Sequence, residues 1–140
     1  MAQFETRKSK MKIVTAAIIE NNGKVLLTRR SRGQALGGRW EFPGGKLEEG
    51  ESLQQCLERE IQEELSVKIK AGDIFDESVF HYEKGTIRLV AIHAELLQED
   101  IQLSVHDKFD WVEKKLLGTY DFAPADIPIA KKLQESCSDE

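Results

Sequence analysis

Residues Ser52 to Leu65 carry the pattern that most restricts the fold of this chain. Apolar side chains recur there with helical spacing, at Leu53, Leu57, Ile61 and Leu65. Ser52 and Gln55 form an S-x-x-Q capping box just ahead of this series, which is typical of a helix start. The pattern predicts a helix over residues 53–66 with one apolar stripe. Such a stripe must be covered by another layer of structure.

Three glutamates of this helix lie close to the apolar stripe. At about 100° per residue on a helical wheel, Glu60, Glu63 and Glu64 fall within an arc of roughly 100°, and Glu64 overlaps the stripe. One interpretation is a solvated charged face, yet such a face would lie opposite the stripe. Arg59, at roughly 260° on the same wheel, is expected to be poorly placed to serve all three carboxylates. The alternative is a hard divalent cation such as Mg²⁺, which carboxylate oxygens bind and which offsets their repulsion.

The rest of the chain predicts strands and loops around this helix. Segments rich in Val, Ile and Leu or with alternating apolar residues predict strands at 13–19, 24–28, 39–42, 73–82, 86–96 and 108–112. The stretch "PADIPIAKKLQES" predicts a closing helix. We expect an α/β fold in which a mixed β-sheet is sandwiched between α-helices. Residues 1–12 are expected to be flexible or partly ordered, and residues 13–136 to form a single domain.

Composition excludes several classes of partner. The net charge of −5 argues against binding to a nucleic acid polymer, which depends on clustered Lys and Arg. Cys56 and Cys137 show no metal-ligand spacing and are expected to be free thiols in a reducing compartment. The chain has no run of about 18 apolar residues, and its basic start leads into a hairpin rather than a cleavage site. The sequence predicts a soluble cytoplasmic protein without membrane contact.

The loop ahead of the helix, "GGRWEFPGGKLEEGES", brings Gly44 and Gly45 close to the helix start. A glycine backbone can approach a ligand closely because no Cβ intervenes. This loop is not a Walker A loop, which requires G-x-x-x-x-G-K-[ST], because Glu51 and Ser52 follow Gly50. Phosphate binding by a Walker A loop is therefore excluded.

Loop and helix together resemble the Nudix box, G-x5-E-x7-R-E-U-x-E-E-x-G-U, in which U is a bulky aliphatic residue. Gly45 and Glu51 match its start, "REIQEEL" from residue 59 matches its centre, and Val67 matches its end. Ser66 replaces the last glycine, where a left-handed turn costs a non-glycine residue about 1 kcal/mol or more. Residues 12–135 are most similar to the MutT-like branch of Nudix hydrolases, especially CTP pyrophosphohydrolases and 8-oxo-dGTP diphosphatases.

The resemblance implies a Nudix fold and a metal site with Mg²⁺ as the cofactor and Mn²⁺ as the alternative. The implied metal ligands are the Gly44 carbonyl, Glu60, Glu63 and Glu64. Glu51 and Arg59 are implied to position this cluster and complete the catalytic set with Glu60 and Glu64. Glu60 is expected to be the general base, with Glu64 as the second candidate.

A second departure from the family lies ahead of Trp111. Many relatives carry a metal-binding glutamate just before a histidine at this place, whereas Val105 precedes His106 in this chain. Asp107 follows and is expected either to replace the missing ligand or to be a surface residue. His106 is expected to be structural.

Substrate binding is implied to involve Arg30, Lys46 and Asp126, of which Arg30 and Asp126 fall where MutT-like enzymes contact the nucleobase. The Asp126 carboxyl can accept a hydrogen bond from an exocyclic amine or, when protonated, donate one. Alternatively, Asp126 caps the closing helix, which is a favoured position for aspartate. Three aromatic residues are candidates for stacking on a base, although aromatic residues on strands more often belong to the core: Phe42, Phe80 and Tyr82.

The resemblance implies Mg²⁺-dependent hydrolysis of a nucleoside triphosphate to a monophosphate and pyrophosphate. CTP, dCTP or an oxidised triphosphate such as 8-oxo-dGTP is the expected small-molecule substrate, in nucleotide pool sanitation and DNA repair. The expected state is a monomer or a homodimer. The alternative is a catalytically weak Nudix-like domain that binds a nucleotide as a sensor. An enzyme acting on nucleotide sugars is disfavoured because the compact chain lacks an extra dimerising domain.

Overall fold

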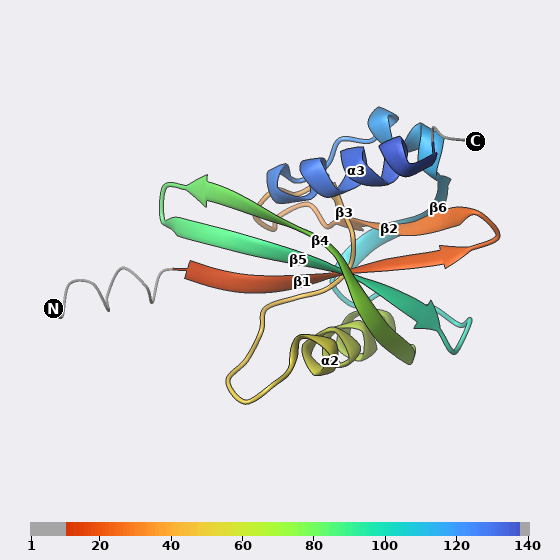
Figure 1. Ribbon diagram of the computed structural model, residues 1–140, viewed down its shortest axis with the longest axis horizontal. Coiled ribbons are helices and arrows are strands. Elements are labelled where there is room, and N and C mark those ends of the chain that lie inside the picture. The colour runs from red at the N-terminus through yellow and green to blue at the C-terminus, as the bar shows by residue number, and fades with distance from the viewer. Residues whose placement is uncertain (1–10, 138–140) are drawn as a thin grey trace, which may run out of the picture.

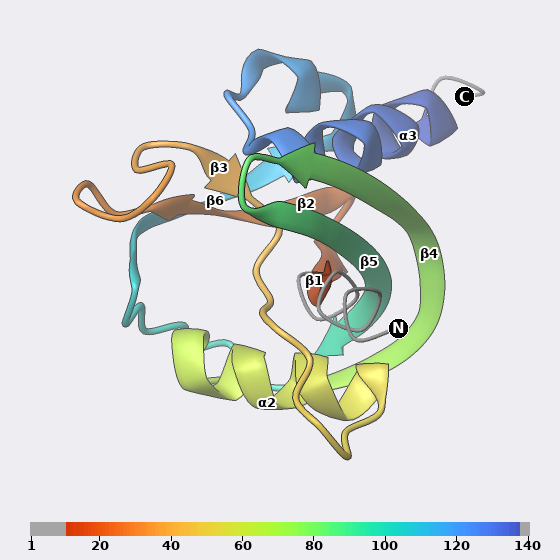
Figure 2. The same ribbon diagram turned by 90° about the vertical axis from the view of Figure 1, so that its left-hand side faces the viewer.

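The computed structural model describes residues 11–137 and shows strands that lie between two helices (Figures 1 and 2). The strands are β1 (Met11–Asn21), β2 (Lys24–Arg30), β3 (Trp40–Glu41), β4 (Ile69–Tyr82), β5 (Gly85–Leu96) and β6 (His106–Glu113). The helices are α2 (Leu53–Leu65) and α3 (Ile127–Cys137), with the 3-10 helices η1 (Lys114–Thr119) and η2 (Pro124–Asp126). The predicted mixed sheet sandwiched between α-helices is confirmed.

The strand order is β3-β2-β1-β5-β4, and β6 also pairs with β2. β1 runs parallel to β5, whereas the other strand pairs are antiparallel. The β1–β2 hairpin is paired only next to its turn, where Glu20 lies opposite Val25. The strands then separate, and the loop ahead of α2 takes the place beside β1, with Lys46 opposite Val14. This loop is thereby held between β1 and α2.

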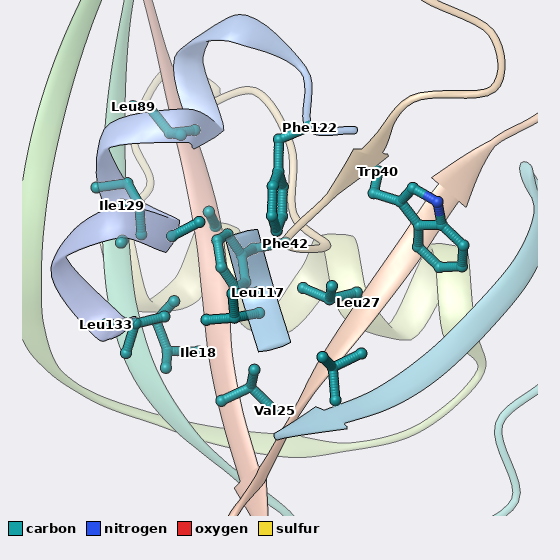
Figure 3. Close-up of a cluster of buried hydrophobic side chains, with 14 residues drawn as sticks. Ile18, Val25, Leu27, Trp40, Phe42, Leu89, Leu117, Phe122, Ile129 and Leu133 are labelled. Carbon is teal, nitrogen blue, oxygen red and sulfur yellow. The ribbon is translucent and has the colours of Figure 1, made fainter. Parts of the chain in front are cut away.

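The strands at the centre are buried on both faces. Thr15 to Ile19 of β1 and Leu89 to Ile92 of β5 are continuously buried, as expected for strands covered on both sides. Ala16 and Ile18 pack on the side of α3, in the cluster shown in Figure 3. Their neighbours Ala17 and Ile19 pack on the opposite side, against α2. Both helices are therefore anchored on the same strands.

Helix α2 begins as predicted and ends one residue earlier. Ser52 is the N-cap, and the capping box with Gln55 is formed in both directions. Ser66 takes the left-handed conformation, with φ 58° and ψ 32°, and its backbone N–H donates to the Gln62 carbonyl. The left-handed turn expected at the last glycine of the Nudix box is therefore formed by Ser66, although this conformation is sterically unfavourable for serine.

Several predicted boundaries differ from the observed ones. Strand β1 starts at Met11, so the last two residues of the segment 1–12, which was expected to be flexible or partly ordered, belong to a strand. The rest of that segment, residues 1–10, lies outside the described residues. The closing helix is present, preceded by a 3-10 turn. Cys56 is free and buried, while the Cys137 side chain lies outside the described part. No helix within residues 11–137 is long and apolar enough to cross a membrane.

Candidate active site

A cleft of about 840 Å³ opens between the loop ahead of α2, the ends of β4 and β5, and the segment that leads into α3. It is lined by six of the nine residues that the sequence predicted for the site: Arg30, Gly44, Lys46, Glu60, Glu64 and Asp126. The other three, Glu51, Arg59 and Glu63, do not line it. The structure thus brings the three substrate candidates and three of the four metal candidates, without Glu63, into one cavity.

The glycine loop lies along β1 like a short strand. The backbone N–H groups of Ala17 and Thr15 donate to the carbonyls of Pro43 and Gly45 at 2.7 and 2.8 Å. Because successive carbonyls of an extended segment point in opposite directions, the Gly44 carbonyl points away from β1. A Cβ at Gly44 would collide with the Thr15 carbonyl, and a Cβ at Gly45 would collide with the Glu60 carboxyl group. Close packing against the β1 backbone therefore requires glycine at position 44, whereas a side chain at position 45 would displace the Glu60 carboxyl group.

Arg59 is the hub of an ion-pair cluster beside the cleft. Its Nε and Nη2 atoms donate to both oxygens of Glu51, at 2.6 and 3.0 Å, and hold the Glu51 pKa down to about 2. Its Nη1 atom donates to Glu60 at 2.9 Å and to Glu63 at 3.2 Å. Arg59 thus pairs with two of the three carboxylates, and the expectation that it is poorly placed to serve all three holds only for Glu64. The Arg59 side chain is long enough to extend along the helix surface, whereas a helical wheel gives only the direction in which a side chain leaves the helix.

Glu64 is the glutamate that Arg59 does not reach. Its side chain is half-buried, and its Oε1 atom is buried with no hydrogen-bond partner among residues 11–137. Burial, together with the negative charges of Glu41 and Glu60, raises the Glu64 pKa to about 8. The Glu60 side chain is 14% exposed, whereas that of Glu63 is 58% exposed. The predicted crowding at the core is therefore confirmed for Glu60 and Glu64, and Glu63 lies towards solvent.

The residues around Glu64 fit a small divalent cation. Glu60, Glu64 and Gly44 line the cleft together and offer carboxylate and carbonyl oxygens, which is the ligand type that Mg²⁺ prefers. The unpartnered Glu64 oxygen needs a positive partner. Within the described part of the chain, no three acidic, His or Cys side chains already form a metal-ligand cluster. Arg59 holds Glu60 and Glu63 instead, so these carboxylates must turn to bind a cation.

Glu41 is a cleft residue that the sequence interpretation missed. Arg30 Nε donates to Glu41 Oε1 at 2.9 Å, and His106 Nε2 lies 2.9 Å from Glu41 Oε2. His106 was expected to be structural; it is buried, yet it lines the cleft, and its Nδ1 has no partner within the described residues. The single acidic residue inside the apolar strand "RWEF" was the available signal for Glu41. A lone buried carboxylate requires partners that only the fold brings to it.

Asp126 is buried at the same end of the cleft. Its Oδ2 atom accepts a hydrogen bond from the Phe42 backbone N–H at 3.0 Å. Burial raises the Asp126 pKa well above its ordinary range, and the negative charge of Glu41 adds to the effect. The capping interpretation is wrong, because this side chain binds the backbone after β3 rather than the start of α3. A protonated Asp126 has a proton to donate into the cleft.

Asp107 does not replace the missing acidic ligand. It pairs with Arg29 at 2.7 Å and does not line the cleft, whereas Val105 does. Residues 105–107 therefore supply no carboxylate to the cleft.

All three aromatic candidates line the cleft, but Phe42 also belongs to the core. Phe42 is 2% exposed and stacks on Phe122, with ring centroids 5.5 Å apart. Phe80 is exposed and Tyr82 is half-buried, and both line the cleft from the end of β4. Phe80 and Tyr82 thus retain surface that a ligand can cover.

Comparison with known proteins agrees with this arrangement. The NUDIX domain model matches residues 10–133. A protein named "CTP pyrophosphohydrolase" from Escherichia coli (strain K12) is 38% identical over 120 residues, covering 86% of this chain and 89% of that protein. An "8-oxo-dGTP diphosphatase" from Haemophilus influenzae is 32% identical, with the same coverage of 86% and 89%. The MutT protein from Methanosarcina mazei Go1 has a TM-score of 0.81 at 28% identity, covering 90% of this chain and 94% of that one.

The raised pKa of Glu64 predicts a pH-dependent stability in the absence of metal. Between pH 4.5 and about 8 the unfolded chain releases the Glu64 proton while the folded chain keeps it, so stability falls as pH rises. In chelator, Glu64→Gln is expected to melt higher than the wild type, with a difference that is small at pH 5 and grows towards pH 8. Glu63→Gln, which alters an exposed carboxylate, should show no such growth. Parallel melting curves for the Glu64→Gln variant and the wild type would contradict the assignment.

Proposed function

Because this chain belongs to the NUDIX domain family and is a Nudix hydrolase, we propose that it is a Mg²⁺-dependent nucleoside triphosphate pyrophosphohydrolase. Its products are a nucleoside monophosphate and pyrophosphate. The substrates we propose are CTP or dCTP, or an oxidised triphosphate such as 8-oxo-dGTP, in nucleotide pool sanitation. The observation that carries the proposal is the joint presence of the unpartnered Glu64 carboxylate and the buried Asp126 carboxyl in one cleft. The first suits a cation, and the second suits the edge of a base.

When bound, a divalent cation would supply charge neutralisation on the phosphates and a more acidic water. Glu60, Glu64 and the Gly44 carbonyl would hold it, joined by Glu63 after release from Arg59. Glu51 fixes the Arg59 side chain through two parallel hydrogen bonds. Arg59 in turn orients the Glu60 and Glu63 carboxylates. Arg59 also donates to the Lys46 carbonyl at 3.2 Å, which holds Lys46 at the cleft where its ammonium can bind phosphate.

Two carboxylates can take the proton of the attacking water. Arg59 occupies Glu60 Oε2, whereas Glu64 Oε1 has no donor within residues 11–137. Glu64 Oε1 is also the oxygen that would bind the cation, and an oxygen held by the cation cannot take the proton. We therefore keep the order expected from sequence, with Glu60 as the general base and Glu64 as the second candidate.

A sensor domain without turnover is the alternative function. It would keep the cleft and its base-reading carboxyl but would have no need for the glutamate cluster and its arginine. The relatives named as a pyrophosphohydrolase and a diphosphatase favour turnover. Pyrophosphate release from a panel of triphosphates with Mg²⁺ separates the two functions.

Loss of a cleft carboxylate is expected to abolish most turnover. Glu60→Gln or Glu64→Gln should lower kcat at least about 100-fold, because charge stabilisation in a transition state is commonly worth that much. Glu58→Gln is the matched control on the same helix, since Glu58 lies away from the cleft and glutamine can still accept from the Ala71 N–H. The measurement is pyrophosphate release at saturating substrate. Wild-type rates in both cleft variants would refute the proposed site.

Asp126 is expected to influence which base is accepted. In Asp126→Asn the side-chain oxygen can still accept from Phe42, so the melting temperature should stay close to that of the wild type. The amide cannot offer the proton of a carboxylic acid and adds a fixed pair of donors, so relative kcat/KM among triphosphates should shift about tenfold or more. An unchanged ranking in this variant would remove Asp126 from base recognition.

A further inference from the structure

Leu36 lies in the loop between β2 and β3 and lines the mouth of the cleft. Its φ of 60° is left-handed, which is unfavourable for a bulky residue and marks a candidate functional position. It is 47% exposed and belongs to neither core cluster. The same loop has glycine at its other left-handed positions, Gly33 and Gly38. Neither backbone preference nor burial in the folded chain therefore explains a leucine at this position.

Two further apolar side chains are exposed in the same cleft. Phe80 of β4 is 36% exposed, and Val105, just before β6, is 39% exposed. Neither belongs to a core cluster. We call Leu36, Phe80 and Val105 the apolar collar. They come from three separate segments of the chain, and surface of this kind is stabilised when a ligand covers it.

Hydrogen bonds connect the collar to the end of the cleft that contains Asp126. Arg30 donates to the Ala35 carbonyl, next to Leu36, at 3.3 Å and to Glu41 at 2.9 Å. His106, next to Val105, lies 2.9 Å from the other oxygen of Glu41. The residue after Glu41 is Phe42, whose N–H binds Asp126. Glu41 thus places two collar residues near the base-reading carboxyl.

The β2–β3 loop, which carries Leu36, is also bonded directly to Val105. Ser31, at the start of the β2–β3 loop, donates from its hydroxyl to the Val105 carbonyl at 2.9 Å. The loop is closed at its base by the bond from the Arg30 N–H to the Arg39 carbonyl at 2.9 Å. Leu36 and Val105 therefore belong to one hydrogen-bonded rim of the cleft.

Resting on the hydrolase function proposed above, we propose that the apolar collar contacts the base of the bound nucleotide and that Leu36 is a specificity-determining residue. A nucleoside triphosphate has one flat and weakly polar part, its base, and the phosphates and sugar do not match an uncharged rim. Lys46 and the glutamates provide the charged part of the cleft. Val105, where many relatives carry an acidic metal ligand, is then a base contact in this chain.

The test compares ligands with and without a base on the full-length chain in Mg²⁺ buffer. Isothermal titration gives the Kd of CMP, of 8-oxo-dGMP and of pyrophosphate for the wild type, Leu36→Ala and Leu36→Gly. Leu36→Ala removes the side chain, and Leu36→Gly also relieves the left-handed backbone. Both variants should raise the Kd of at least one monophosphate about tenfold, the scale of uncovering a leucine side chain, and should change the Kd of pyrophosphate less than about twofold. Leu97→Ala, at a leucine that is 55% exposed outside the cleft, should change neither.

Other outcomes would overturn the proposal that the collar contacts the base. Unchanged affinity for both monophosphates in the two Leu36 variants would show that Leu36 does not touch the base. An equal loss for monophosphates and pyrophosphate would show that the loop shapes the whole cleft. Sedimentation also compares the size of the Leu36 variants with that of the wild type. If the variants form a smaller assembly and bind both monophosphates as the wild type does, the collar is an interface between copies of this chain. Hydrolysis of triphosphates by the wild type is measured separately. If the wild type binds the monophosphates through Leu36 but hydrolyses no triphosphate, the proposed function is refuted and the proposal for the collar is still supported.

Discussion

The close approach of the Gly44–Gly45 segment to both β1 and helix α2 is the constraint on which the cleft depends. A Cβ at either glycine would collide with protein atoms, with the Thr15 carbonyl on one side and the Glu60 carboxyl group on the other. Two bonds from the β1 backbone hold this segment in place, at 2.7 and 2.8 Å. As a result, a backbone carbonyl and the carboxylates of α2 face the same small volume.

This arrangement is possible because the strands beneath it are buried on both faces. β1 packs against α3 through Ala16 and Ile18 and against α2 through Ala17 and Ile19. The helix that carries the glutamates is therefore fixed to the same strand that binds the glycine loop. The parallel partner of β1, strand β5, lines the far side of the cleft with Ile87 and Leu89. A rigid scaffold of this kind keeps charged groups close together at a cost that the apolar core offsets.

Local sequence patterns predicted the parts of the fold that local physics controls. The capping box, the apolar stripe of α2 and the inward position of Glu64 follow from helical spacing, and all three are present. Side-chain reach and contacts between distant segments were beyond such patterns. Arg59 serves more carboxylates than its wheel angle suggests, and Asp126 binds the Phe42 backbone instead of capping a helix. Glu41 and His106, which are 65 positions apart, meet only because β3 and β6 both pair with β2.

The central claim is that a divalent cation offsets the crowding of Glu60 and Glu64 in this Nudix hydrolase. The most direct measurement is the melting temperature at pH 8 while Mg²⁺ is titrated into chelator-treated protein, for the wild type and for Glu64→Gln. A cation that binds only the folded chain raises stability with the logarithm of its concentration above Kd. The wild type is therefore expected to melt progressively higher as Mg²⁺ increases, and Glu64→Gln to respond much less. A wild type that does not respond to Mg²⁺, or an equal response in both proteins, would contradict the claim.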